Sequence, residues 1–491
     1  MESETQKIPT IAIIGSGISG ICAFIQIQKQ LGITAQVYEM NKDVGGTWLN
    51  NTYPNCRCDV TSHMYSFSFE MNPNWSQTFS TQAEILQYLR DVAQKYNMLS
   101  HVQFRTKIAS AVWMQDQKQW QLEILDLTSN TTHLAYYDII FSAVGTLRVP
   151  NIPSLYNKFT GPLMHTGHWD ASIDLKGKRV ALVGSGASAV QVIPHLALES
   201  SQLISFQRTA PWVVPQILST ISEGTKRTFS NYPVVLFMYR CVLFILYDLL
   251  YILLGYPNSF LARYFEKKIA ADNKETILQL GRPDLVDEIL PTYPMGCKRG
   301  AFSTNYYQTL AQPHVKVVKD HITDIRDSHI ITEDGTLHQV DVVVLATGFK
   351  THDGMLSDIS IIGKHGQSLT EMWKEQRPQL FKSTTIHGFP NMFMLLGPYS
   401  ILGHHSLVFM AETQVAYAIR CIKELTLIEP KKSAQDEYMA RIISNFQGTS
   451  WLASCTSWYK NDRGEIINLY PSSATKFKWE LTRFDKQDYM S

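Results

Sequence analysis

Short apolar runs of strand length alternate with longer helix-like stretches through both halves of the chain. One apolar run covers 11–14 and ends at Gly15, and a second covers 180–183 and ends at Gly184. Each run is followed by a stretch with the spacing of an amphipathic helix. Strands that alternate with helices favour parallel sheets, so the pattern predicts an α/β protein.

The first break has the spacing Gly15-x-Gly17-x-x-Gly20 between an expected strand and an expected helix. Such a turn lets backbone N–H groups and a helix N-terminus face a pyrophosphate. Glu39 ends the next strand-like run, where a carboxylate accepts hydrogen bonds from ribose hydroxyls and repels a 2′-phosphate. The turn therefore predicts a site for FAD or NAD, and the alternative is a glycine turn with a structural role only.

The second break repeats this spacing as Gly184-x-Gly186, with Ala189 in place of the last glycine. No acid follows the next strand-like run, which instead ends at Arg208 and Thr209. A cation at this point suits a 2′-phosphate, so NADPH is preferred, although Arg208 could also be a solvated surface charge. Two such turns predict two Rossmann-like dinucleotide-binding domains, for FAD and NADP, with electron transfer between the cofactors.

The chain order suggests that the second nucleotide-binding unit is inserted into the first. Prolines near residue 150 mark a linker, and apolar runs that end at Gly145 and Gly348 look like strands of the two sheets. The predicted segments are an FAD-binding part at 1–148, an NADP-binding part at 149–214, a helical insertion at 215–292, a second NADP-binding part at 293–345, and a second FAD-binding part with the C-terminal region at 346–491.

Composition narrows the class of protein. The chain has 491 residues, 45% apolar and 18% charged, and a formal net charge of +1, so it is globular and offers no broad basic field for nucleic acid. The first ten residues are polar and unlike a cleaved secretory signal, so a cytoplasmic location is expected. Seven scattered cysteines suggest free thiols in a reducing compartment, and their spacing gives no zinc site. No metal is expected.

One segment, 234–254, is long and apolar enough to cross a bilayer. Arg240 and Asp248 argue against a span, because each charge costs about 2.5–3.5 kcal/mol near a helix centre. A single crossing would also separate Arg208 from Lys298, which are both expected at one NADPH. The segment is therefore expected to be a buried or interfacial helix, which walls a lipophilic pocket or associates peripherally with a membrane surface.

Several motifs, in a fixed order, identify a family. The first turn is followed by Val44-Gly-Gly46-Thr47-Trp48 and then by Tyr53-Pro-Asn-Cys-Arg57-Cys-Asp59. The string Phe159-x-Gly161-x-x-x-His165-x-x-x-Trp169-Asp170 comes before the second turn, and Cys297-Lys298-Arg299, Ala346-Thr347-Gly348 and Ser457-Trp-Tyr come after it. Over nearly the whole chain, this sequence resembles the class B flavoprotein monooxygenases of the Baeyer–Villiger type.

The resemblance implies a reaction and two catalytic residues. In that family, reduced flavin and O₂ form a C4a-peroxyflavin that attacks a ketone and inserts one oxygen atom next to the carbonyl, which gives an ester or a lactone. Arg299 matches the arginine that stabilises the peroxyanion, and Asp59 matches the carboxylate that positions it. A permanent charge with fixed donors suits this task. The alternatives are a surface cation for Arg299 and a helix N-cap for Asp59.

The resemblance also suggests residues at the cofactors. The FAD side would use Gly15, Gly17, Ser19, Gly20, Glu39, Gly46, Thr47, Trp48, Asp59 and Tyr65. The NADPH side would use Gly184, Ser185, Gly186, Ser188, Gln191, Arg208, Thr209, Lys298 and Arg299. The fingerprint residues Phe159, Gly161, His165 and Trp169 would couple the domains. The histidine-rich loop at 403–406 is expected near the flavin or the substrate.

Other functions remain open from the sequence. The same cofactors could oxygenate nitrogen or sulfur in an electron-rich substrate instead of a lipophilic ketone. A flavin disulfide reductase is disfavoured, because no cysteine pair follows the first turn at the usual spacing. A flavoprotein redox sensor without enzymatic activity is the last alternative.

Overall fold

Two five-stranded parallel sheets organise the molecule in this computed structural model, which describes residues 8–216, 218–351 and 355–490. In spatial order the first sheet consists of β19 (Met392–Met394), β7 (Ile139–Ser142), β1 (Ile11–Ile14), β2 (Gln36–Tyr38) and β3 (Val102–Gln103). The second consists of β13 (Val315–Val318), β10 (Gln202–Phe206), β9 (Arg179–Val183), β17 (Val342–Leu345) and β8 (Leu163–His165).

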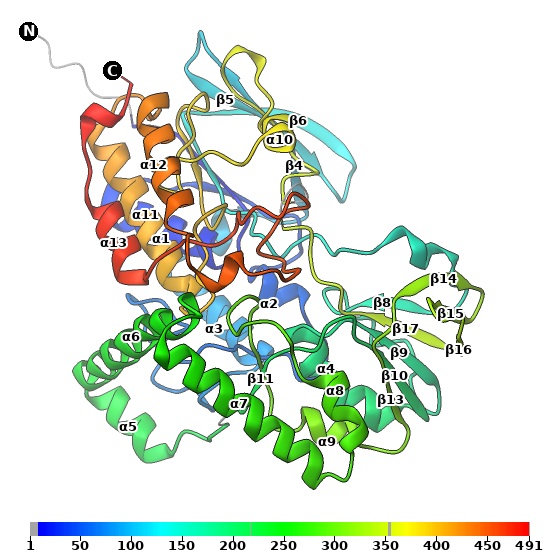
Figure 1. Ribbon diagram of the computed structural model, residues 1–491. Coiled ribbons are helices and arrows are strands. Elements are labelled where there is room, and N and C mark those ends of the chain that lie inside the picture. Colours follow the sequence, from blue (N-terminus) through cyan, green and yellow to red (C-terminus); the bar gives the residue numbers. More distant parts are fainter. Residues whose placement is uncertain (1–7, 217, 352–354, 491) are drawn as a thin grey trace, which may run out of the picture.

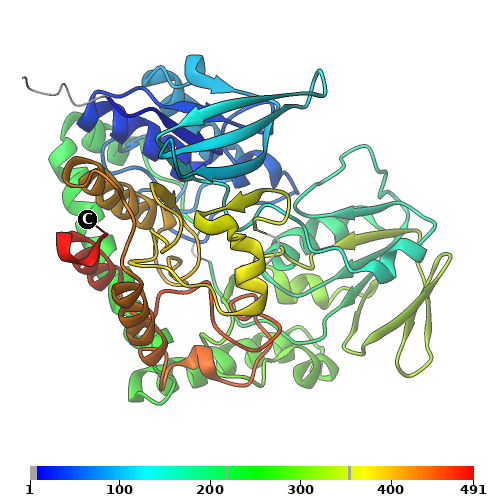
Figure 2. The same cartoon turned by 90° about the horizontal axis from the view of Figure 1, so that it is seen from above.

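Strands from distant parts of the chain meet in each parallel sheet. The second sheet takes strands from both predicted NADP-binding parts, and β19 returns from the C-terminal part to pair with β7 in the first sheet. The exact segment boundaries stay predictions. Figure 1 shows the two sheets side by side, and Figure 2 shows the second sheet set apart from the first in the view from above.

Three smaller sheets flank the parallel ones. One is built from β18 (Ser360–Ile362), β4 (Thr106–Met114), β5 (Gln119–Asp126) and β6 (Thr131–Tyr137). Another consists of β14 (Ile322–Arg326), β15 (His329–Thr332) and β16 (Leu337–Gln339), and the last pairs β11 (Val213–Val214) with β12 (Ala301–Phe302). Alternating buried and part-buried residues along β4 and β5 pack one face of the first of these sheets.

Each glycine turn opens a helix, because the apolar strand before it is buried and the following residues bury one helical face. α1 (Ile18–Leu31) follows β1, and α4 (Ala187–Glu199) follows β9. The remaining helices outside the insertion are α2 (Thr47–Asn50), α3 (Gln82–Lys95), α9 (Tyr306–Leu310), α10 (Leu369–Glu375), α11 (Leu407–Glu424), α12 (Lys432–Ser444) and α13 (Ala474–Thr482). α1 packs against α11, which in turn packs against α13 (Figure 1).

The predicted insertion is helical and lies along one side of the molecule (Figure 1). It contains α5 (Glu223–Asn231), α6 (Pro233–Gly255), α7 (Phe260–Gln279) and α8 (Val286–Ile289). Within the described residues, one helix is long and apolar enough to span a membrane, over Pro233–Tyr251. Only 17% of its most apolar window is buried, so α6 is not a core helix.

The expectation that all cysteines are free is wrong. Cys297 and Cys455 form a disulfide, with 6.4 Å between their Cα atoms. They lie 158 residues apart in sequence, so their spacing gave no indication of the pairing. Cys22, Cys56, Cys58, Cys241 and Cys421 are free thiols. The disulfide joins the segment before Arg299 to the C-terminal tail.

Candidate functional site

The backbone of the first glycine turn lies so close to neighbouring backbone atoms that there is no room for a Cβ at Gly15 or Gly20. Gly15 has a φ of +104°, and a Cβ there would lie 2.6 Å from the carbonyl oxygen of Ala143. A Cβ on Gly20 would lie 2.0 Å from the carbonyl oxygen of Gly15. Gly17 begins α1 without a side-chain cap, so the first N–H groups of the helix point into the turn. This is the cradle that a pyrophosphate requires.

Glu39 lies directly beyond β2 and is 4% exposed. One of its carboxylate oxygens accepts hydrogen bonds from the N–H and the hydroxyl of Ser16, each at 2.8 Å. The other accepts from the N–H of Asn41 at 2.8 Å and from its side-chain amide at 2.7 Å. These four donors fix the carboxylate beside the turn, where it suits a ribose.

Both glycine turns contribute to one cavity of about 420 Å³. Its wall includes the predicted residues Gly15, Gly17, Ser19, Glu39, Gly46, Thr47, Trp48, Asp59, Tyr65, Gly186, Ser188, Gln191 and Arg299. Gly20, Gly184, Ser185, Arg208, Thr209 and Lys298 lie outside that wall. Because the two cradles share a cavity, two dinucleotides bound there would meet within it.

Trp48 and Tyr65 form one aromatic side of the cavity. The indole nitrogen of Trp48 donates to the hydroxyl of Tyr65 at 3.1 Å, and the rings meet edge to face at 5.6 Å. Gln191 of α4 crosses to the FAD side, where its amide donates to the carbonyl oxygen of Arg57 and accepts from the hydroxyl of Tyr53. α4 is thereby tied to the loop that carries Asp59.

A basic cluster surrounds Thr209 on the NADPH side. The Lys298 ammonium donates to the Thr209 hydroxyl at 2.5 Å, and the Ser185 hydroxyl donates to the Thr209 carbonyl at 2.6 Å. Burial lowers the pKa of Lys298 to about 8, and repulsion from Arg208 contributes to the same shift. Two cations held close together need an anion between them, and a phosphate dianion fits this arrangement.

Arg299 and Asp59, which are 240 residues apart in sequence, form a two-point ion pair. Nε and Nη2 of the guanidinium donate to the two carboxylate oxygens at 2.5 and 2.8 Å. Nη1 donates to the carbonyl oxygen of Gly403 at 3.1 Å. Burial alone would raise the pKa of Asp59, but attraction and hydrogen bonds from Arg299 hold it below its ordinary value. The pKa of Arg299 is raised despite burial, because Asp59 stabilises its charge.

A smaller cavity of about 100 Å³ begins on the far side of this ion pair. Besides Asp59, Lys298, Arg299 and Gly403, it is lined by Val60, Trp212, Val214, Tyr247, Leu250, Met295, Gly296, Gly300, Phe302, His404, Trp451 and Tyr459. Arg299 and Asp59 therefore lie where a cofactor cavity meets a mostly apolar pocket. Of the histidine-rich loop, His404 faces the small cavity and His405 the large one.

The sequence predicted that the segment at 234–254 could wall a lipophilic pocket, but it did not identify the residues of the apolar wall. Tyr247 and Leu250 come from α6, and Trp451 and Tyr459 come from the C-terminal tail. The resemblance included the tail motif that holds Tyr459, but nothing in that motif indicated which cavity it faces. For α6, the inward positions of Tyr247 and Leu250 could not be told from the sequence, because their neighbours Leu246 and Leu249 are equally apolar but exposed.

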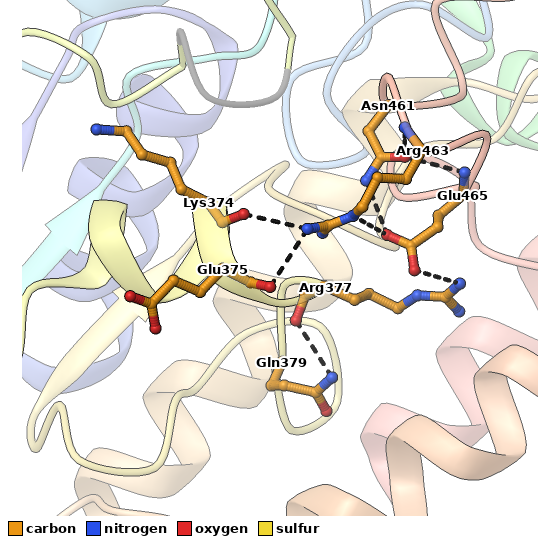
Figure 3. A network of polar contacts seen from close by, with 7 residues as sticks. All are labelled: Lys374, Glu375, Arg377, Gln379, Asn461, Arg463 and Glu465. Atoms are coloured by element: carbon orange, nitrogen blue, oxygen red, sulfur yellow. Dashed lines mark hydrogen bonds and ion pairs between the residues drawn. The ribbon is translucent and has the colours of Figure 1, made fainter.

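A polar network holds the tail in place (Figure 3). The Glu465 carboxylate accepts hydrogen bonds from Asn461, Arg463 and Arg377, at 2.8, 3.1 and 3.3 Å. Arg463 also donates to the carbonyl oxygens of Lys374 and Glu375 in α10, and the Gln379 amide donates to the carbonyl oxygen of Arg377 (Figure 3). The loop that presents Tyr459 is therefore anchored from both its disulfide side and this side.

The fingerprint residues lie outside both cavities. Phe159 packs in a separate apolar cluster between the second sheet and β14–β16, and a Cβ on Gly161 would lie 2.8 Å from the Phe159 ring. Burial lowers the pKa of His165 to about 4, and its ring meets Phe349, a residue of the large cavity, edge to face. Trp169 contacts His195 of α4 in the same way. These contacts fit a role in coupling the domains.

Comparison with known proteins agrees with this geometry. Residues 8–467 match the family described as Flavin-binding monooxygenase-like. A Baeyer-Villiger monooxygenase of Streptomyces coelicolor is 34% identical over 98% of this chain and 92% of its own length. A Baeyer-Villiger monooxygenase of Pseudomonas aeruginosa is 33% identical over 98% of this chain and 90% of its own length.

Solved structures show the same architecture. The structure of OTEMO in complex with FAD and NADP has a TM-score of 0.84 at 25% identity, and it covers 97% of this chain and 98% of its own. An oxidized steroid monooxygenase bound to NADP has a TM-score of 0.81 at 26% identity, with 96% and 97% covered. The predicted fold class and the resemblance noted in the sequence are both confirmed. The chain belongs to the flavin-binding monooxygenase-like family.

Proposed function

We propose that this protein uses FAD, NADPH and O₂ to insert one oxygen atom next to the carbonyl of a lipophilic ketone. The ketone, O₂, NADPH and one proton would give an ester or lactone, NADP⁺ and water. The observation that carries the proposal is the position of Arg299, which is paired with Asp59 between the cofactor cavity and an apolar pocket. Relatives named Baeyer-Villiger monooxygenases and related structures with FAD and NADP support it.

Different residues of this chain would bind FAD, bind NADPH and assist the oxygen insertion. The turn from Gly15 to Gly20 would hold the FAD pyrophosphate, with Glu39 on the ribose, and Lys298 with Arg208 would hold the 2′-phosphate of NADPH. When bound, FAD supplies the redox chemistry, because it takes a hydride from NADPH and activates O₂. The chain's part in the oxygen insertion falls to the site around Arg299.

Arg299 would stabilise the negative charge that develops as oxygen attacks the carbonyl carbon. Its donors are fixed by Asp59 and the Gly403 carbonyl before the reaction, so little reorganisation is needed when the charge appears. The apolar pocket wall excludes water, and a guanidinium is therefore more effective there than at the surface.

The test is oxygen uptake by purified protein with NADPH and a panel of ketones. We expect the parent enzyme to form ester in step with NADPH oxidation. Arg299→Ala should still oxidise NADPH but release hydrogen peroxide without forming ester. Sulfides assayed in parallel at several pH values decide the N- or S-oxygenation alternative. Sulfoxide as the sole product of the parent would replace the ketone proposal. If the protein binds FAD but takes up no oxygen, the result would favour the alternative of a flavoprotein redox sensor without enzymatic activity.

We also propose that the enzyme is cytoplasmic and associates peripherally with a membrane through residues 234–254. The support is the poor burial of α6, whose apolar window is only 17% buried. A soluble chain seldom leaves so large an apolar surface without a partner.

A further inference from the structure

α6 presents a continuous apolar face to the outside. Nine of its large hydrophobic side chains are exposed, with Val234 at 72%, Met238 at 57% and Ile245 at 57% among the most accessible. The full set is Val234, Val235, Phe237, Met238, Tyr239, Val242, Ile245, Leu246 and Leu249. The beginning of α7 adds Phe260, Leu261, Tyr264 and Phe265. We call these thirteen residues the apolar face.

The two charges of α6 point away from this face. Arg240 donates to the carbonyl oxygen of His63 and to the hydroxyl and carbonyl of Ser66, and it is 9% exposed. Asp248 accepts from the N–H of Ala474 at 2.6 Å, at the start of α13. Both ionic groups are used to fasten α6 to the body of the enzyme. The helix therefore lies along the protein, and its outer side carries no charge that would oppose contact with hydrocarbon.

Exposed cations lie on the two helices that pack against α6. Arg227 in α5 and Arg263 and Lys267 in α7 are exposed, and α5 and α7 both pack against α6. The nearby Glu266 is turned inward, where its carboxylate accepts from the N–H of Met295 at 2.9 Å. An apolar surface with cations on the adjacent helices matches anionic lipid headgroups above a hydrocarbon layer.

The opposite side of α6 belongs to the active site. Tyr247 and Leu250 line the small cavity beside Arg299, while Leu246 and Leu249, their neighbours in sequence, are 55% and 52% exposed. An α-helix with side chains is only about 10–12 Å across. One helix thickness thus separates the apolar face from the pocket that would receive the ketone.

We propose that the apolar face docks on an anionic lipid bilayer and that the enzyme takes its lipophilic ketone directly from that bilayer. The second part rests on the proposed Baeyer–Villiger function, whereas the docking does not. Membrane contact by this face gives a lipophilic substrate a short path that avoids water.

Docking is tested with the FAD-loaded enzyme and sedimenting vesicles, without ketone or NADPH. We expect binding to phosphatidylcholine vesicles that contain phosphatidylglycerol and weaker binding to pure phosphatidylcholine. Leu246→Glu combined with Leu249→Glu should reduce binding by about tenfold or more. The matched control is Leu134→Glu, because Leu134 is 53% exposed and its strand β6 lies far from α6 (Figure 1). This variant should bind like the parent. Unchanged FAD content and thermal midpoint show that each variant is folded.

Equal vesicle binding by the parent and the double variant would overturn the docking. The same holds if light scattering shows that the parent is a dimer that the double variant disrupts, with no vesicle binding, because a second copy would then cover the face. Arg263→Glu with Lys267→Glu should remove the preference for phosphatidylglycerol, and a retained preference would contradict the assigned charge contact.

Delivery from the bilayer is tested with two ketones. Turnover of vesicle-dissolved 2-tridecanone should fall about tenfold or more in the double variant, in proportion to its lost binding, while turnover of water-soluble cyclohexanone stays at the parent level. Equal loss or equal retention with both ketones would overturn delivery. If neither ketone gives ester with the parent although vesicles bind, the proposed function and delivery both fail and the docking stands.

Discussion

The ion pair between Arg299 and Asp59 makes a quantitative prediction. Asp59→Ala would remove the only carboxylate that the described residues pair with the guanidinium, while Nη1 keeps its hydrogen bond to the Gly403 carbonyl. Removing one partner of a buried pair costs about 3–5 kcal/mol, and side-chain exposures of 22% and 21% place this pair at the lower end, near 3 kcal/mol. Since each 1.36 kcal/mol is tenfold in rate, we expect ester formation to fall by roughly a hundredfold. Asp59→Asn keeps an acceptor and should lose about tenfold.

The assay must distinguish the loss of Arg299 positioning from a general loss of enzyme structure or cofactor binding. Ester yield per NADPH oxidised should fall in Asp59→Ala and Arg299→Lys, while anaerobic reduction of the flavin by NADPH stays near the parent rate. The matched control is Asp341→Ala. Asp341 makes a similar two-point pair with Arg179, at 2.6 and 3.1 Å, on the second sheet outside both cavities. This variant should keep the parent yield.

The pH dependence gives a second readout of the same pair. Because Arg299 holds the pKa of Asp59 below its ordinary value, the carboxylate and its pairing persist as the pH falls through the usual carboxyl range. They are lost only when the pH drops through the lowered pKa. The acid limb of ester yield per NADPH should therefore lie below pH 4 in the parent and vanish in Asp59→Asn. Parent-like ester yield in either Asp59 variant would refute the reasoning.

Three further predictions concern the cofactor cradle and the disulfide. A Cβ on Gly186 would meet no protein atom within 4 Å, whereas a Cβ on Gly184 would lie 2.4 Å from the Ala346 carbonyl oxygen. Gly186→Ala should therefore keep its yellow FAD and its thermal midpoint but raise the KM for NADPH about tenfold. Gly184→Ala should lower the thermal midpoint. Parent-like KM in Gly186→Ala would contradict the pyrophosphate site. The preference for NADPH over NADH, measured as a ratio of kcat/KM values, should decline as the pH rises through about 8, because the Lys298 ammonium loses its proton there. Lys298→Arg should make this ratio independent of pH. A ratio that is independent of pH in the parent would exclude Lys298 from the phosphate site. Peptide mapping without reductant should recover Cys297 joined to Cys455. Cys455→Ser should lower the free energy of unfolding by about 2–5 kcal/mol. Seven free thiols in the folded protein would contradict the disulfide.

The cofactor half of the site could be predicted from local sequence because its constraints are local. Gly15 and Gly20 lie five residues apart, and the steric demand of their close approach is met within one strand–turn–helix unit. Glu39 follows the next strand of the same sheet, so its place beside the turn is fixed by the topology of that unit. For these residues, spacing in sequence is a good measure of position in space.

The ion pair could be predicted only through the family resemblance. Asp59 lies in a loop after α2 and Arg299 lies just before β12, and no periodicity relates them. Arg240 and Asp248 show the reverse problem. In sequence they count as charges that an apolar helix must bury at a cost, but their partners at 63–66 and 474 remove that cost. A charge in an apolar run can be judged only when its partner is known.

The substrate half of the site combines long-range contacts of this kind. The small cavity is closed by α6 from the insertion, by the loop at 403–404 and by the tail with Trp451 and Tyr459. The Cys297–Cys455 disulfide and the Glu465 network hold the tail, and the two inward charges hold α6. Each of these restraints joins segments that are far apart in sequence and close to Arg299 in space. The cofactor turns could stay unchanged while these segments vary, so substrate choice can change in this architecture without disturbing the redox site.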